Sequence, residues 1–247
     1  MGAAESRVEN IRRLQKQILV MQGLARISEK EKVKIGLPAI EQSFPNQTFP
    51  TGAIHEFISH TLIDGAATNG FLAGLISFLA QNKGICFWIS IQRRLFPPAL
   101  KNFGIAPERV VFIDVSREKE ALWTIEEALK CKAVAAVVGE LSNFDFTASR
   151  RLQLAVEQSH VTGFIHRIQP KTESPVACVS RWKITPLASI QEDGDAPGVG
   201  FARWNVQLLK VRNGQPGSWQ IEWTGDGFQQ VAQFTRSQSQ QRFAKTA

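Results

Sequence analysis

Residues 63–81, "IDGAATNGFLAGLISFLAQ", decide the fold of this chain because they have the outline of a phosphate-binding loop that leads into an apolar helix. Gly65 and Gly70 are separated by four residues, which is the glycine spacing of such a loop. Phe71 stands where the loop carries lysine, and Leu72 stands where it carries serine or threonine. The helix is predicted over residues 69–81, and it is apolar nearly all round, so we expect it to be deeply buried.

The chemistry of this loop is incomplete for a nucleotide site. A working loop holds phosphates with backbone N–H groups, a lysine and a hydroxyl that binds Mg²⁺. Residues 35–82 contain no Lys or Arg, so only partial charges face a triphosphate here. We therefore expect no tight binding of MgATP and no cofactor. The simpler reading is that Gly65 and Gly70 shape a turn between strand and helix, and that Phe71 fills the vacated space.

Two further positions of an ATPase site have the wrong residue type. A Mg²⁺-linked Asp is expected after the buried strand 133–138, where the sequence has Gly139 and Glu140. A catalytic carboxylate is expected after the strand 84–90, where the sequence has Gln92. An amide is no general base at ordinary pH. The three changes together predict a pseudo-ATPase rather than an enzyme.

Outward from the loop, apolar strands alternate with helices. Strands are predicted at 53–59, 84–90, 109–115, 133–138 and 161–167, and helices at 69–81, 97–104, 116–131 and 147–160. Ser116 and Thr147 are the predicted N-caps of the last two helices. This alternation predicts an α/β fold with a mostly parallel sheet flanked by helices on both faces.

The character of the sequence changes after Pro170. Residues 177–187, 201–214 and 218–225 read as strands without intervening helices, and they are expected to extend the sheet antiparallel at one edge. Three parts follow from this pattern. They are an N-terminal helical arm and linker (1–36), a core (37–226), and a mobile, basic, Gln-rich tail (227–247).

The N-terminal arm carries a narrow apolar stripe. A helix is predicted over residues 5–26, and the members of its stripe are Ile11, Leu14, Ile18 and Met21. Two readings remain open from the residues. The helix packs on its own domain, or it docks on a neighbouring copy or a partner.

Bulk properties indicate a cytoplasmic protein with an anionic partner. The 247 residues carry a net charge of +7, and the isoelectric point is about 9.6. The first residues are charged and lack the apolar core of a secretion signal, and no membrane span is expected. Three scattered cysteines, Cys86, Cys131 and Cys178, imply neither a disulfide framework nor a metal site.

A basic face is the candidate surface for DNA or protein contacts. Its members are Arg150, Arg151, Arg181, Lys183, Arg203, Lys210 and Arg212. Four tryptophans on the neighbouring strands, Trp182, Trp204, Trp219 and Trp223, are candidates for stacking on bases of single-stranded DNA. The alternative is ordinary: strand tryptophans lie in the core, and strand Lys and Arg form a solvated face.

Several of these segments together resemble one family, the ImuA proteins, which are RecA-like accessory proteins of bacterial inducible-mutagenesis cassettes. The segments are "FPTGAIHEF", "GAATNGFL", "ICFWISIQ", "ALWTIEEAL", "AVVGEL", "ASRRLQLA", "VTGFIHR", "SRWKITPL" and "RWNVQLLKVRNG". The resemblance covers residues 40–224, and "SRRLQLA" with the two "RW" strands is its most specific part.

The resemblance implies a RecA-like core and a role in error-prone translesion DNA synthesis within the SOS response to DNA damage. It implies a Y-family-like protein, a dedicated replicative-type polymerase and RecA as partners, with single-stranded DNA as a further candidate. It also implies that the N-terminal helix docks on a neighbouring copy, as the corresponding arm of RecA-type proteins does.

Two alternatives to an accessory factor are kept. SulA-type cell-division inhibitors, which bind the division GTPase, are a shorter nucleotide-free variation on this fold. A functional RecA-type ATPase is disfavoured by Phe71, Leu72 and Gln92. The connection between 167 and 180 is also too short for a long DNA-binding loop.

Overall fold

The computed structural model describes residues 10, 13–14, 34–80, 84–189 and 200–231. In chain order, its helices and strands within the core are α2 (Pro38–Glu41), β1 (Ile54–Ser59), α3 (Leu62–Ala80), β2 (Ile85–Ser90), η2 (Pro97–Phe103), η3 (Pro107–Arg109), β3 (Val110–Asp114), α4 (Glu118–Lys130), β4 (Val134–Leu141), α5 (Phe146–Ser159), β5 (Thr162–Ile168), β6 (Ser180–Leu187), β7 (Ala202–Val211), β8 (Gly217–Trp223) and β9 (Phe228–Gln230).

The strands form one nine-stranded sheet in the order β3-β2-β4-β5-β1-β6-β7-β8-β9. The strands from β3 to β6 run parallel, and β7, β8 and β9 follow antiparallel. This confirms the predicted α/β, RecA-like class. One detail differs, because β6 was expected among the antiparallel strands and instead pairs parallel with β1, with Glu56 beside Arg181.

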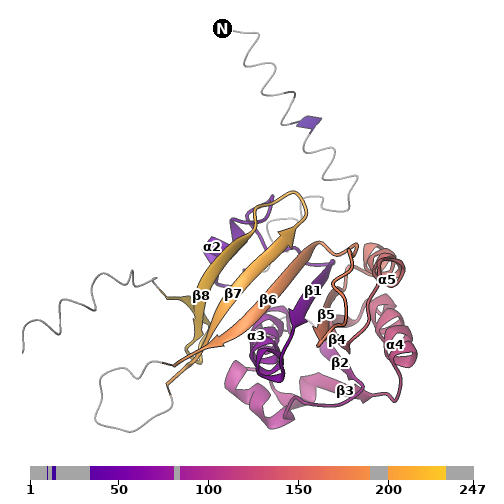
Figure 1. The fold of residues 1–247 in the computed structure, drawn as a ribbon, viewed down its shortest axis with the longest axis horizontal. Helices are drawn as coiled ribbons and strands as arrows, with labels where there is room; N and C mark the ends of the chain where they lie inside the picture. Colours follow the sequence, from indigo (N-terminus) through magenta and orange to yellow (C-terminus); the bar gives the residue numbers. More distant parts are fainter. Residues whose placement is uncertain (1–9, 11–12, 15–33, 81–83, 190–199, 232–247) are drawn as a thin grey trace, which may run out of the picture.

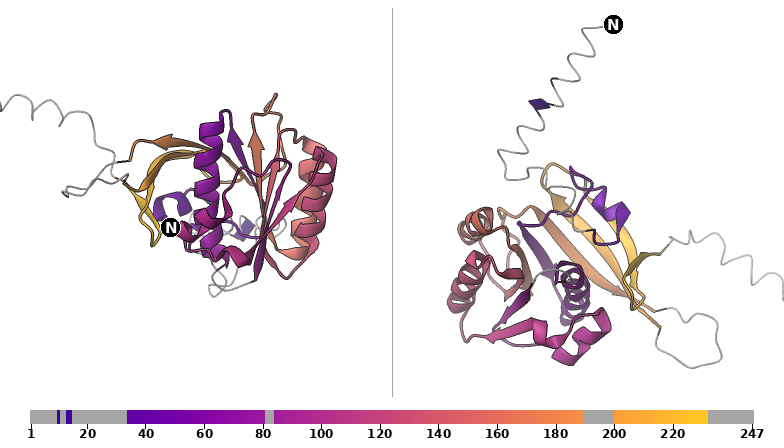
Figure 2. Two further views of the ribbon diagram at one scale, coloured as in Figure 1. Left: turned by 90° about the horizontal axis from the view of Figure 1, so that it is seen from below. Right: turned by 180° about the vertical axis from the view of Figure 1, so that it is seen from behind.

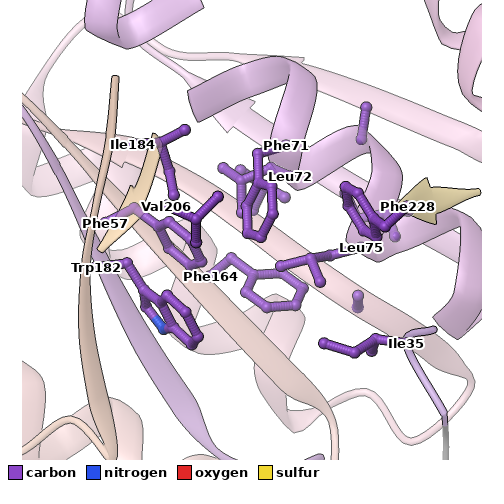
Figure 3. Packing of buried hydrophobic residues seen from close by; sticks show 14 of the residues in the cluster. Ile35, Phe57, Phe71, Leu72, Leu75, Phe164, Trp182, Ile184, Val206 and Phe228 are labelled. Atoms are coloured by element: carbon purple, nitrogen blue, oxygen red, sulfur yellow. The ribbon is translucent and has the colours of Figure 1, made fainter. Parts of the chain in front are cut away.

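Helices cover both faces of the parallel part of the sheet, as predicted. Helix α3 lies on one face, and α4 and α5 lie side by side on the other (Figures 1 and 2). Two hydrophobic clusters fill the layers. Cluster 1 lies on the α3 face and contains Phe57, Phe71 and Trp182. Cluster 2 lies under α4 and α5 and contains Ile125 and Leu152. Figure 3 shows how rings from several strands meet α3 in cluster 1.

Helix α3 begins seven residues earlier than predicted, which corrects the reading of the glycines. It starts at Leu62, so Gly65 and Gly70 both lie inside the helix and shape no loop or turn. Gly70 instead makes room for neighbouring rings. A Cβ atom at Gly70 would lie 3.1 Å from Cζ2 of Trp204, and one at Gly74 would lie 2.5 Å from Cζ of Phe228. The two glycines, four residues apart on one helix face, let the C-terminal strands pack closely on α3.

Both predicted N-caps are wrong by one or two residues. Helix α5 is capped by Asp145, whose side chain accepts from the backbone N–H of Ala148, and Thr147 lies inside the helix. Helix α4 begins after Arg117, which makes no side-chain cap, and the backbone N–H of Ser116 donates to Glu120. Gly104 ends η2, as predicted. Its backbone is left-handed, with φ at 70°, a conformation that favours glycine at the end of a helix.

The proposed boundaries of the core move outward at both ends. Ile35, assigned to the arm and linker, is 1% exposed and belongs to cluster 1. Residues 228–230, assigned to the tail, form β9, and Phe228 packs 5.0 Å from Phe71 between ring centroids. The rest of the predicted tail from residue 232 lies outside the described residues.

By length and composition alone, α3 is apolar enough to cross a membrane, with a mean hydropathy of 1.4. However, 61% of that window is buried inside the protein, and the buried core helix of a soluble protein passes the same test. The sheet wraps around α3 in Figure 2, which is the arrangement of a core helix.

Two glycine variants test the place of α3. In Gly65→Ala the new Cβ meets only Cε1 of His166 at 4.0 Å, an ordinary contact. A gain in helix propensity should then raise the free energy of unfolding by about 0.5–1 kcal/mol. In Gly74→Ala the clash with Phe228 should cost about 1–3 kcal/mol and outweigh that gain. Chemical denaturation measures both; a destabilised Gly65→Ala would place Gly65 in a turn after all.

Candidate functional site

Polar side chains gather where the parallel strands end. In the order of the sheet, these residues are Asp114 on β3, Ser90 on β2, Glu140 on β4, His166 on β5 and Ser59 on β1. Ligands of open α/β sheets bind in the crevice outside the carboxyl ends of the strands. This edge is therefore where a nucleotide would lie, and its geometry decides whether one fits.

A capping box occupies the place of the phosphate loop. The backbone N–H of Asp64 donates to Oγ1 of Thr61 at 3.0 Å, and the backbone N–H of Thr61 donates to Oδ2 of Asp64 at 3.2 Å. The side chain of Thr61 thus accepts from a backbone N–H group that a bound phosphate would need. The carboxylate of Asp64 lies at the positive end of the helix dipole. An approaching phosphate would meet the negative charge of Asp64.

The two residues at the lysine and hydroxyl positions face the core. Phe71 is 1% exposed and Leu72 is fully buried, both in cluster 1 (Figure 3). The ring of Phe71 lies 6.0 Å from that of Trp204 between centroids. Neither side chain points toward the edge of the sheet where phosphates would lie. Phe71 therefore packs among core aromatics, and the prediction that it fills a vacated phosphate site is wrong.

A short hydrogen-bonded chain links α3 to β1 and β5. Oγ of Ser59 lies 2.9 Å from Oγ1 of Thr68 and 2.9 Å from Nε2 of His166. Burial lowers the pKa of His166 to about 3, so its ring is neutral at physiological pH. Nδ1 of His166 and Oδ1 of Asn69 are buried without a hydrogen-bond partner among the described residues. These hydrogen bonds fix the helix on the sheet, and burial keeps the His166 ring neutral.

Glu140 is the most perturbed acid at this edge. It is 4% exposed and accepts a hydrogen bond of 2.9 Å from Nε1 of Trp88. Burial raises its pKa from the ordinary 4.5 to about 7, although Trp88, Arg94 and Asn69 act in the opposite direction. A carboxyl group that is half protonated near neutral pH is a weaker ligand for Mg²⁺ than an ionised carboxylate.

Gln92 lies in an exposed loop among charged residues. Its Oε1 accepts from the Arg94 guanidinium at 3.4 Å. Arg93 forms a two-bond pair with Asp114, at 3.2 and 2.5 Å, and its guanidinium lies 4.8 Å from the centre of the Phe112 ring. The described part of the chain contains no group of three or more His, Cys, Asp or Glu side chains placed to hold a metal ion.

The structure separates the predicted basic face into two kinds of residue. Arg181 donates to the buried Glu56 at 2.5 Å, Arg203 is 8% exposed and lies 3.8 Å from Glu222, and Arg151 pairs with Glu126 on α4. Arg181 and Arg203 are largely buried in these pairs, whereas the side chain of Arg151 is 54% exposed. Arg150, Lys183, Lys210 and Arg212 remain at least partly accessible.

Three of the four tryptophans offered as stacking platforms are core residues, as the ordinary alternative predicts for them, and the fourth is half-buried. Trp182, Trp204 and Trp223 are 1%, 3% and 6% exposed, and Trp219 packs against the same cluster. They alternate with polar residues along strands whose one face lies on α3, and the apolar positions take the covered face.

A buried ion triad was missed by sequence reasoning. Glu56 pairs with Arg167 at 3.0 Å and with Arg181 at 2.5 Å. The two guanidinium groups also donate to the carbonyl oxygens of Thr172 and Ser174. The triad therefore clamps the connection between β5 and β6 onto the sheet. Each of three apolar strands carries a charged residue, and this pattern could have predicted the triad, because a buried charge is stable only when it is paired.

Replacing Glu140 by Gln tests the buried carboxyl group. Between pH 4.5 and 7 the folded state binds a proton that the unfolded state has released, so wild-type stability should fall as pH rises through this window. The loss should approach about 3 kcal/mol. Glu140→Gln keeps the acceptor for Trp88 and should lack this loss in unfolding curves taken across the window. Glu108→Gln, at an exposed position, is the control; equal slopes for Glu140→Gln and wild type would contradict the raised pKa.

Known proteins similar to this chain were found by sequence and by structure. No protein-family model matches the chain. A crystal structure of SulA from Pseudomonas aeruginosa matches with a TM-score of 0.40 and 20% identity, over 48% of this chain and 99% of SulA, which is too weak to carry an argument. The chain is 36% identical over 202 residues to the protein ImuA of Caulobacter vibrioides, in strains NA1000 / CB15N and ATCC 19089 / CIP 103742 / CB 15. Because that match covers 77% of this chain and 82% of the relative, the chain belongs to the ImuA family.

Proposed function

We propose that this protein is a non-catalytic accessory factor in damage-inducible, error-prone translesion DNA synthesis, and that it acts in the cytoplasm by binding other proteins. Membership of the ImuA family supports the link to damage-inducible mutagenesis. The observation that carries the non-catalytic part is the capping box of Thr61 and Asp64, which fills the position of a phosphate loop. Phe71 and Leu72, buried in the core, supply none of the missing charge.

The proposed partners are a Y-family-like protein, a dedicated replicative-type polymerase and RecA. The N-terminal stripe is one proposed contact surface, for these partners or for a second copy of the chain. Leu14, the one member of the stripe within the described residues, is helical and 53% exposed, which leaves it open for such contacts. Ile11, Ile18 and Met21 lie outside the described residues.

The edge strand β3 offers a second contact surface. It is the first strand of the sheet, and no other described strand pairs with its outer edge. Its sequence, Val-Val-Phe-Ile-Asp, has neither the lysine nor the proline that commonly protects an edge. Val111 is 40% exposed and lies in register with the half-buried Phe87 of β2. A partner segment that added a strand here would satisfy the free backbone groups and cover these side chains.

Nucleotide binding tests the non-catalytic part of this proposal. Titration of the purified full chain with a fluorescent ATP analogue and Mg²⁺ should give no saturable binding in the micromolar range, because the carboxylate of Asp64 repels the phosphates. An active RecA recombinase under the same conditions serves as the positive control. Saturable binding that unlabelled ATP displaces would refute a pseudo-ATPase.

Mutagenesis in cells tests the accessory role. In the encoding bacterium, deletion of the gene should abolish damage-induced mutation, and the wild-type chain should restore it. Val111→Glu should fail to restore it, because it places a charge where a partner strand would pack. Leu154→Glu, on α5 and 45% exposed, is the matched control and should behave as wild type.

Two results would count against these statements. If deletion leaves damage-induced mutation unchanged, the accessory role is wrong. If Val111→Glu restores mutation as well as Leu154→Glu does, partners do not use the β3 edge. An affinity pull-down from damaged cells distinguishes the SulA-like alternative, which requires recovery of the division GTPase in place of a polymerase component or RecA.

A further inference from the structure

The outer face of β6, β7 and β8 is polar and carries no helix of the described chain (Figures 1 and 2). Trp182 and Ile184 of β6, and Val206 and Leu208 of β7, point into cluster 1, so the residues between them face the other way. The outward residues are Arg181, Lys183, Thr185, Asn205, Gln207, Leu209, Lys210, Ser218, Gln220 and Glu222.

Positive charge gathers at one corner of this face, where β6 begins and β7 ends. Arg181 lies directly opposite Lys210 in the β6–β7 pair, and Lys183 lies two residues farther along β6. Arg212 follows Lys210 by two residues, and its backbone N–H donates to the carbonyl oxygen of Val179 at 2.8 Å. Like charges placed directly opposite each other destabilise a strand pair. The fold keeps this pair, with Arg181 bound from within by Glu56, whose single negative charge is shared with Arg167.

The start of α5 reaches the same corner. Ala177 donates its backbone N–H to Oγ of Ser149 at 2.9 Å and accepts from the Arg212 guanidinium at 3.1 Å. Arg150, the next residue of α5, is exposed and has one ion pair, with Glu157 at 3.8 Å. We call Arg150, Lys183, Lys210 and Arg212 the basic corner.

Little negative charge opposes the basic corner. Lys183 and Lys210 form no ion pair with another described residue, and Glu56 is fully buried. Glu222 lies toward the other end of the face, opposite Arg203 in the β7–β8 pair. The corner is therefore a net cationic surface that a polyanion complements.

The composition of the face favours nucleic acid over protein. Protein interfaces have an apolar core enriched in aromatic residues, whereas interfaces with DNA are polar and positively charged. Leu209, 43% exposed, is the one large apolar side chain of this face that is exposed. All the tryptophans of β6, β7 and β8 point into cluster 1, so these three strands offer bases no aromatic ring to stack on.

We propose that the basic corner binds the sugar–phosphate backbone of DNA, without base stacking and without sequence preference. Residues two apart on a strand, such as Lys210 and Arg212, lie about 7 Å apart. That distance is close to the separation of neighbouring phosphates on one DNA strand, which exceeds the axial rise of about 3.4 Å because the backbone winds around the axis. Because contacts are made to phosphates alone, duplex DNA should bind at least as tightly as single-stranded DNA. This inference is independent of which proteins the chain assists.

Fluorescence anisotropy with a short labelled duplex of mixed sequence tests this inference on the full chain. Four phosphate contacts predict that log K falls with log salt with a slope of about −3 to −4. Lys183→Gln/Lys210→Gln should weaken binding at about 50 mM salt and make the slope shallower by about two. Lys119→Gln/Lys132→Gln removes the same charge from exposed positions in α4 and the turn that follows it, and is the control. It should retain the wild-type slope.

Three outcomes would overturn the proposal: no binding of the duplex by the wild-type chain, equal weakening by the two double variants, or a strong preference for the single strand. Equal weakening would indicate attraction by net charge alone. Unfolding curves of both variants confirm that they are folded. Failure here leaves the accessory role standing, because that role is read from mutation frequency in cells.

Discussion

The packing of Phe71 against aromatic rings from the sheet is the interaction on which the rest of this structure depends. Its ring lies within 6.5 Å, between centroids, of Phe57 on β1, Trp182 on β6, Trp204 on β7 and Phe228 on β9. One side chain thus ties α3 to strands far apart in the sequence. Such ring pairs add to the free energy already gained by burying the apolar area. A lysine at this position would put a charge into the largest cluster of the core.

Phe71 also bears on the proposal that the carboxyl edge of the sheet binds no nucleotide. With an apolar residue at 71, α3 packs on the sheet as a continuous helix that begins at Leu62, shortly after β1 ends. A capping box satisfies backbone N–H groups at its first turn. A nucleotide-binding loop needs those turns open and its N–H groups free. Core packing and phosphate binding therefore compete for the same residues, and in this ImuA protein packing has prevailed.

Buried polar groups give the fold its register rather than a reaction. Glu56, between Arg167 and Arg181, fixes three adjacent strands and the connection that crosses them. His55 is similarly held, with Nδ1 2.6 Å from Oγ of Ser180 and Nε2 2.7 Å from the carbonyl oxygen of Pro50, and burial lowers its pKa to about 4. Glu56 and His55 both find their partners within the protein, although Nε of Arg167 has no hydrogen-bond partner among the described residues.

The sequence by itself determined the α/β class, the alternation of strands and helices, and the residue types that depart from those of a nucleotide site. The hydrophobic periodicity that distinguishes strands from helices depends only on neighbouring residues. The residue types at positions 71, 72 and 92 are visible in the sequence itself. It did not determine where α3 begins, although Thr61 and Asp64 carry the capping signal, because glycine spacing suggested a loop. Only the tertiary structure decided which arginines form ion pairs within the fold. It also decided that the tryptophans face α3. Pairing and burial depend on strand order, which brings together residues more than a hundred positions apart, such as Glu56 and Arg181.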